Sequence, residues 1–205
     1  MLRETFVALT NGYSDDLVLI NQLWQEIEQC YSASKRYYHN LQHLSHLLSQ
    51  ITEVKAQFLQ WDVALFSLYY HDIVYSATKS DNETNSAALA LKRMGELDVS
   101  IELIKSCEAQ ILATKSHELS GNSDTNLFTD ADLAILGASW EDYVIYYQSV
   151  RKEYAIYPDF MYRPGRKKVL EHFLKMPKIY KTDYFYQKLE ERARENIARE
   201  IVLLS

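Results

Sequence analysis

Residues that turn or cross-link a chain are scarce in this sequence. Its 205 residues include only five glycines, three prolines and two cysteines. Folds made of strands and tight turns use glycine and proline at their turns, so this scarcity favours long helices joined by short loops. The two cysteines, Cys30 and Cys107, form no CxxC pair, and we interpret both as reduced, buried thiols.

An excess of positive charge and long apolar runs are also lacking. The formal net charge is -6, which argues against duplex nucleic acid as a partner because no overall positive field would hold its backbone. A small phosphorylated substrate remains compatible, since a bound cation reverses the local potential. The N-terminal residues contain no apolar run of the length of a signal peptide or membrane helix. We therefore expect a cytoplasmic protein without a membrane partner.

Hydrophobic spacing predicts an all-α fold with a single domain over residues 1–205, because the length suits one core. The almost wholly apolar range 59–72 is the expected buried central helix. The polar range 115–129 is the expected longest loop, a candidate rim or lid. The charged last helix is expected to be a solvated face, which leaves a homodimer contact open. The predicted helices cover residues 15–31, 38–54, 59–72, 81–95, 100–114, 130–136, 140–157, 158–175 and 183–204.

Three separate segments carry side chains that suit a metal ion. The first segment places its histidines three or four residues apart, on one face of a predicted helix. The second ends the apolar helix with a His-Asp doublet, where a charged aspartate is costly unless it is paired or ligated. Imidazoles and carboxylates together suit a divalent ion such as Mn, Ni, Co, Fe, Zn or Mg. The candidates are His39 and His43, then His71 and Asp72, then Asp130 and Asp132, whereas His46 is expected to be a packing residue.

The order and spacing of these segments resemble the HD superfamily of metal-dependent phosphohydrolases. The strings RYYHNLQHL, ALFSLYYHDIVY, SDNETNSA and FTDADLAILG are similar to those of a bacterial family described as predicted metal-dependent HD phosphohydrolases. The similarity continues through EYAIYPDF to the charged final helix, and it implies a single HD-type helical bundle. By motif, it implies metal ligation by His43, His71, Asp72 and Asp132, with His39 and Asp130 as alternatives to the first and last.

The resemblance also implies roles for residues around the metal. Asp72 would assist as a base, and Glu83 is a candidate general acid or base near the metal. His39 would touch the substrate or support a ligand, and His117 would contact the substrate or a second metal. Phosphate is expected to meet cationic side chains, because arginine suits its planar recognition. These candidates are Arg36, Lys115, Arg163 and Arg166.

The function that the resemblance implies is hydrolysis of a phosphomonoester or nucleotide by metal-activated water. A second hypothesis is a non-catalytic HD-fold module that binds a nucleotide or metal, and a third is a metal-free helical scaffold. Other catalytic motifs are absent: the sequence has no GxSxG and no GxxxxGK[ST]. HNLQH has the histidine spacing of a zinc protease, but Asn40 stands where the catalytic glutamate would be.

Overall fold

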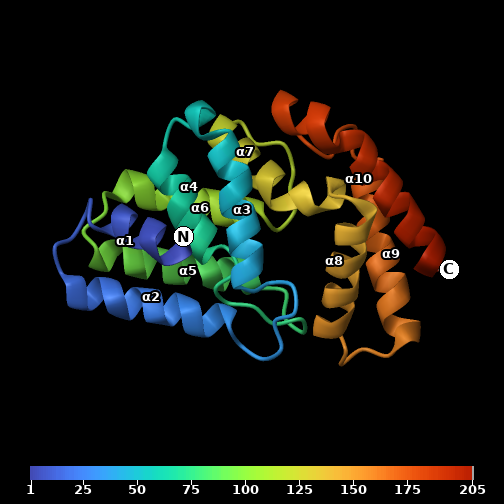
Figure 1. Cartoon of the computed structure of the whole chain (residues 1–205), viewed down its shortest axis with the longest axis horizontal. Helices are drawn as coiled ribbons and strands as arrows, with labels where there is room; N and C mark the ends of the chain where they lie inside the picture. The colour runs from blue at the N-terminus through green and yellow to red at the C-terminus, as the bar shows by residue number, and fades with distance from the viewer. Residues whose placement is uncertain (205) are drawn as a thin grey trace. The chain divides into compact units, whose positions relative to one another are not determined.

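A computed structural model describes residues 1–204 of the chain (Figure 1). Within that range the protein is all-helical, with ten α-helices, two short 3-10 helices and no strand. The expected fold class is therefore confirmed at this level, while the HD-type identity of the bundle stays a prediction. The chain divides into two compact units, residues 1–129 and residues 130 onward. The single domain expected from the sequence likewise stays a prediction.

Unit 1 is organised around the apolar helix α4, which packs against α3, α5 and α6 (Figure 1). Every α4 residue from Val63 to Tyr70 is buried, as expected for a central helix. The helices of this unit are α1 (Leu2–Thr10), α2 (Leu17–Tyr31), α3 (Leu41–Glu53), η1 (Lys55–Gln57), α4 (Trp61–Tyr70), α5 (Asn82–Glu96) and α6 (Ile101–Ala113). Helix α7 (Ser123–Asp132) begins in unit 1 and ends just past the division of the chain.

The helix expected at residues 38–54 begins later than predicted, at Leu41. Asn40 has an extended backbone, and its side chain accepts hydrogen bonds from the amides of Gln42 and His43. Such an N-cap fixes the first turn of a helix. His39 consequently lies in the turn before α3 rather than on a helix face with His43. His46 is on α3 but exposed.

Helix α1 was not predicted, although Leu2, Phe6 and Leu9 recur at helical spacing; it has only nine residues and no side-chain cap. It is held by tertiary contacts instead. The ring centroid of Phe6 lies 5.9 Å from that of Trp24 and 5.0 Å from that of Tyr69. Packing of this kind stabilises helices too short to persist alone.

The prediction of one long loop at residues 115–129 is wrong, because α7 begins at Ser123. Asp124 is buried, and its carboxylate accepts hydrogen bonds from the amides of Leu59, at 3.0 Å, and Gln60, at 2.7 Å. These amides immediately precede α4, where backbone donors need external partners. The polar residues that suggested a loop thus include the side chain that caps the start of α4.

Unit 2 contains η2 (Leu133–Gly137), α8 (Trp140–Glu153), α9 (Asp159–Lys175) and α10 (Asp183–Leu204). Helix α10 packs along α9 and η2. Gly137 allows the close approach, since a Cβ there would lie 2.6 Å from Cβ of Leu189. Helix α10 matches its predicted range, and it buries apolar residues on one face while most of its charged residues are exposed.

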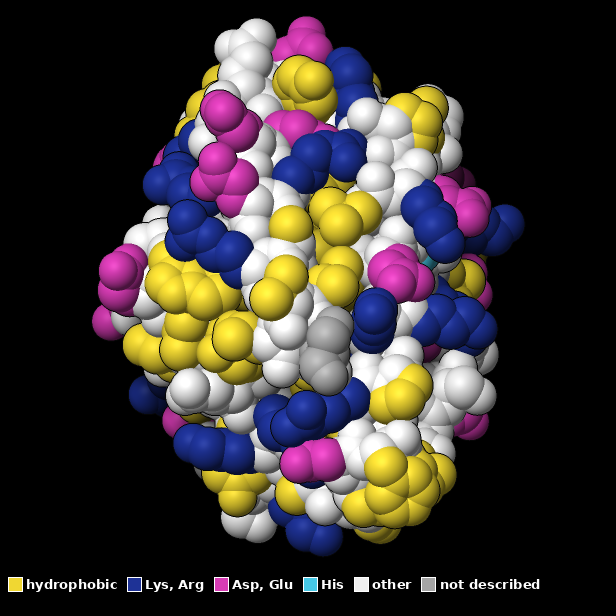
Figure 2. All heavy atoms as spheres, turned by 90° about the vertical axis from the view of Figure 1, so that its right-hand side faces the viewer, with side chains coloured by type: hydrophobic (Ala, Val, Ile, Leu, Met, Phe, Trp, Pro, Cys, Tyr) yellow, Lys and Arg dark blue, Asp and Glu magenta, His cyan; other side chains and the backbone are white. Residues whose placement is uncertain are grey.

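Several large apolar side chains of unit 2 are exposed, among them Phe160, Met161 and Val202. Figure 2 shows hydrophobic side chains lying among Lys and Arg on the face that it presents. The homodimer contact expected from the sequence stays a prediction. No helix within residues 1–204 has both the length and the apolar character needed to cross a membrane.

Replacement of the buried cap Asp124 tests this account of α4. We expect Asp124→Ala to lower the free energy of unfolding by about 1 kcal/mol, because two part-buried amides lose a charged acceptor. Chemical denaturation would measure the change. Asp81→Ala is the control, since Asp81 precedes α5 but makes no side-chain cap bond. Equal losses in the two variants would contradict the assignment.

Candidate metal centre

The end of α4 orients the imidazole of His71. This residue caps the C-terminus of the helix and is 1 % exposed. Its Nδ1 lies 3.1 Å from the carbonyl oxygen of Leu68, one turn earlier. A carbonyl oxygen can only accept, so Nδ1 carries the hydrogen, and in the neutral ring Nε2 keeps its lone pair. A metal-binding histidine is usually oriented in this way.

Side-chain atoms of His43, on α3, and of Asp72 lie close to Nε2 of His71. Nε2 of His43 lies 3.1 Å from Nε2 of His71. Oδ2 of Asp72 lies 3.1 Å from Nε2 of His71 and 3.8 Å from Nε2 of His43. Neighbouring ligand atoms that are each about 2.1 Å from one ion lie roughly 3 Å apart. The spacing of these three atoms therefore suits a divalent cation. His43 and His71 also belong to a group of side chains that could hold a metal ion, and Asp72 is not a member of that group.

His39 lies at the edge of this cluster. Its Nε2 is 4.0 Å from Oδ2 of Asp72, slightly farther than Nε2 of His43. The His39 ring stacks on Tyr75, with ring centroids 4.2 Å apart. His39 is also more exposed than His43. The turn before α3 thus places His39 beside the Asp72 carboxylate, at the more exposed edge of the cluster.

Asp72 is ionised because of its histidine neighbours. Burial would raise the pKa of its carboxyl, but His71, and then His39 and His43, hold that pKa well below its ordinary value. Its backbone is also anchored, since the amide of Asp72 donates to the hydroxyl of Tyr31 at 3.2 Å. A carboxylate in this state carries the negative charge that a cation needs.

The two aspartates of the third segment have different environments. Asp130 is fully buried, and its carboxylate accepts hydrogen bonds from the amides of Lys181 and Thr182 and from the Thr182 hydroxyl, at 2.7–3.0 Å. Nζ of Lys181 lies 3.2 Å from the same carboxylate. Asp130 therefore fixes the segment that leads into α10. Asp132, two residues later, is only half-buried.

The other candidates of unit 1 lie in separate places. Glu83 is half-buried in the first turn of α5. Lys115 donates to the carbonyl of Ser80 at 2.8 Å, which connects the end of α6 to the loop before α5. His117 follows α6 with a left-handed backbone, at a φ of 52°, and its side chain is buried. Arg36 donates to backbone carbonyls next to the histidine cluster.

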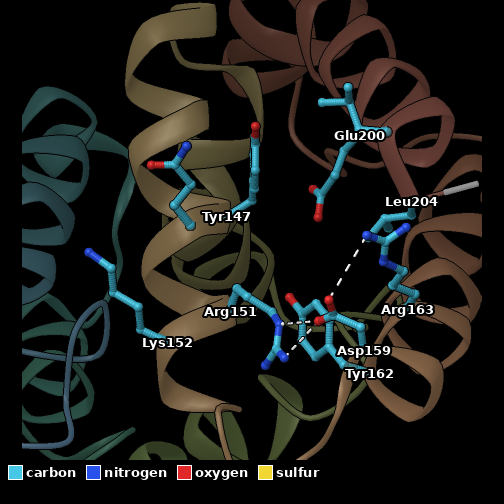
Figure 3. Close-up of a pocket in the computed structure, with 10 residues that line it drawn as sticks. Tyr147, Arg151, Lys152, Asp159, Tyr162, Arg163, Glu200 and Leu204 are labelled. Carbon is cyan, nitrogen blue, oxygen red and sulfur yellow. Dashed lines mark hydrogen bonds and ion pairs between the residues drawn. The ribbon is translucent and has the colours of Figure 1, made fainter.

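The two candidate phosphate-binding arginines of unit 2 have different environments. Arg166 is buried against Glu200, with Nε 2.7 Å from Oε1, and Tyr143 donates to the same carboxylate at 2.6 Å. Arg163 is exposed, 4.0 Å from Asp159, and lines a pocket of about 450 Å³ between α8, α9 and α10. Figure 3 shows Arg151 and Arg163 both reaching Asp159 at this pocket. Arg166 thus serves packing, whereas Arg163 is accessible.

Some residues that shape these sites escaped the sequence analysis. Tyr31 and Tyr75 contact the histidine cluster, and Arg151 ends α8 by donating to the carbonyls of Tyr154 and Tyr157. Of these residues, only Tyr75 could have been suspected from the sequence, because it lies four residues after His71. Of the two cysteines expected to be buried, Cys107 is buried and Cys30 only partly so.

Comparisons with family models, with curated proteins and with solved structures found no match to this chain. The resemblance to HD phosphohydrolases therefore rests on the motifs themselves. The possible function has to be argued from the cluster at the end of α4.

Removal of Asp130 tests its structural role. Burial lowers the pKa of the Lys181 ammonium although Asp130 raises it, so Asp130→Ala leaves a buried cation without its counter-charge. We expect a loss of about 3–5 kcal/mol in the free energy of unfolding, measured by denaturation. Combining Asp130→Ala with Lys181→Met should recover part of the loss. A stable Asp130→Ala protein that has lost a bound metal would instead identify Asp130 as a ligand.

Proposed function

We propose that this protein is a metal-dependent phosphohydrolase of the HD type. One observation carries the proposal: Nε2 of His71, with its tautomer set by the Leu68 carbonyl, lies 3.1 Å both from Nε2 of His43 and from Oδ2 of Asp72. Two imidazoles and a carboxylate that converge at this spacing suit a divalent cation. The ordered HD-like motifs supply the reaction class.

Asp132 is the proposed remaining ligand, and the geometry of α7 supports this choice. Phe128 of α7 lies edge-on to the His71 ring, with centroids 5.9 Å apart. Asp132 follows four residues later in the same helix, so it projects from the same face as Phe128. Asp130 is the weaker candidate because backbone amides and Lys181 occupy its carboxylate.

The residues around the cluster have complementary proposed roles. A divalent ion bound here would activate water and polarise a phosphoryl oxygen of a phosphomonoester or nucleotide. Asp72, beside the two imidazoles, keeps the role of base that the resemblance implies. His39, in its half-buried position at the edge, would donate a hydrogen bond to the substrate. Glu83, Lys115 and His117 remain proposed contributors to proton transfer and charge balance.

A non-catalytic module that binds a metal or nucleotide is the second candidate. This candidate is favoured because three of the four cations expected to bind phosphate contact other groups of the protein instead. Arg36 and Lys115 donate to backbone carbonyls, and Arg166 pairs with Glu200. Such a module would retain its metal and bind phosphates without releasing product. Turnover therefore separates the two candidates.

Metal content and turnover together test the proposal. We expect the purified protein to contain a near-stoichiometric divalent metal by elemental analysis and to release phosphate from a phosphomonoester or a nucleotide. His71→Ala and Asp72→Ala should lose both properties. His46→Ala is the matched control, since His46 is an exposed histidine on the same helix as His43. Metal without phosphate release across a broad substrate panel would favour the binding module, and absence of metal would favour the scaffold.

Metal affinity should decrease as the pH is lowered. Imidazole binds a metal in its neutral form, and an ordinary histidine has a pKa of about 6.5, so protons compete with the metal below that value. We expect the apparent affinity, measured by competition with a chelator, to be highest at neutral pH and to decrease steadily toward pH 5. An affinity that is constant over this range would argue against histidine ligation.

A further inference from the structure

Arg36 connects two segments that carry the proposed metal ligands and their neighbours. It lies in the turn between α2 and α3, three residues before His39. Its Nη1 donates to the carbonyl of His39 at 3.1 Å and to that of Asp72 at 2.7 Å. Its Nη2 donates to the carbonyl of Ile73 at 2.8 Å. One guanidinium therefore binds the backbone on both sides of the histidine cluster.

The carbonyls of Asp72 and Ile73 lie just beyond the C-terminus of α4. A helix C-terminus carries a partial negative charge, which a nearby cation stabilises. The amide of Asp72 is held at the same time by the hydroxyl of Tyr31. The peptide groups on both sides of the Asp72 Cα are thus fixed, and with them the origin of its carboxylate.

Two aromatic rings hold the guanidinium in place. Its central carbon lies 4.9 Å from the ring centroid of Tyr31 and 5.5 Å from that of Tyr75. Tyr75 in turn stacks on His39. The planar guanidinium can lie over the two rings and at the same time donate to three carbonyls, because its donors have fixed directions. The ammonium of lysine is not planar and has no such fixed set of donors.

We propose that Arg36 is a positioning residue of the metal centre, acting by fixing the backbone of Asp72 relative to the turn that carries His39. This role differs from the phosphate contact expected from the sequence. It rests on the proposed metal centre, because it concerns how the ligand Asp72 is placed. Displacing the backbone at Asp72 would move Oδ2 away from the two imidazole nitrogens, which lie only 3.1 and 3.8 Å from it.

Metal binding by Arg36→Lys tests the proposal, since this variant keeps the charge but loses the fork of donors. We expect affinity for Co²⁺, measured by chelator competition, to fall about 10- to 100-fold, as for other residues that orient metal ligands. The visible absorption spectrum of the cobalt-loaded protein should also change. In Arg36→Ala, added methylguanidinium should partly restore affinity and spectrum by occupying the space between the two rings.

Arg93→Lys is the matched control. Arg93 belongs to the same unit, but its partners are Glu26, at 2.6 Å, and Glu96, at 2.9 Å, which lie outside the cluster. This variant should change thermal stability and leave cobalt affinity and spectrum unaltered. Thermal melting of every variant would distinguish a local change at the metal from general loss of structure.

The outcomes separate this inference from the proposed function. A wild-type protein that binds cobalt, together with an Arg36→Lys variant of equal affinity and spectrum, would overturn the positioning role alone. An elevated KM for a phosphate ester in that variant would then identify Arg36 as a phosphate ligand. A wild-type protein that binds no divalent metal would overturn the metal centre and this inference together.

Discussion

A buried histidine followed by a half-buried aspartate at the end of the most apolar helix is the constraint around which unit 1 is arranged. Polar groups removed from water need partners, and an unpaired buried charge is costly. Helix α4 supplies one partner itself, through the Leu68 carbonyl. The others come from the end of α2, the following turn and α3, which bring Tyr31, Arg36 and His43 to the doublet. These segments meet around the backbone of Asp72 and the imidazole of His71.

Buried carboxylates elsewhere in the protein have a different purpose. Asp124, Asp130 and Glu190 each accept hydrogen bonds from consecutive backbone amides that are distant in sequence. Glu190 takes the amides of Ile179 and Tyr180, and Asp130 takes those of the next two residues. In a chain with few glycines and prolines, these carboxylates define how loops enter helices. Acidic residues in a motif therefore require their partners to be known before a chemical role is assigned.

The sequence pattern was sufficient to predict several helices. The apolar face of α2 and the almost wholly apolar run of α4 each gave limits within two residues of those observed, and α10 matches its predicted range. Helix α1 and the beginning of α7 were not predicted. Phe6 packs on the ring of Trp24 in another helix, and Asp124 accepts a hydrogen bond from the amide of Leu59, and neither contact can be read from local periodicity. The spacing from His43 to His71 indicated a cluster, and their nitrogens are adjacent. The role of Arg36 could not be predicted, since its acceptors are backbone carbonyls that no side-chain pattern reveals.

The capping of α4 by Asp124 has a consequence for sequence variation. The carboxylate recognises amide hydrogens, so these bonds place no demand on the side chains of residues 59 and 60. Leu59, which is 85 % exposed, could be exchanged for almost any residue without disturbing the cap. Proline is the exception at both positions, because it has no amide hydrogen. Related sequences would therefore vary at positions 59 and 60 and keep the aspartate that lies 64 or 65 residues later, at position 124.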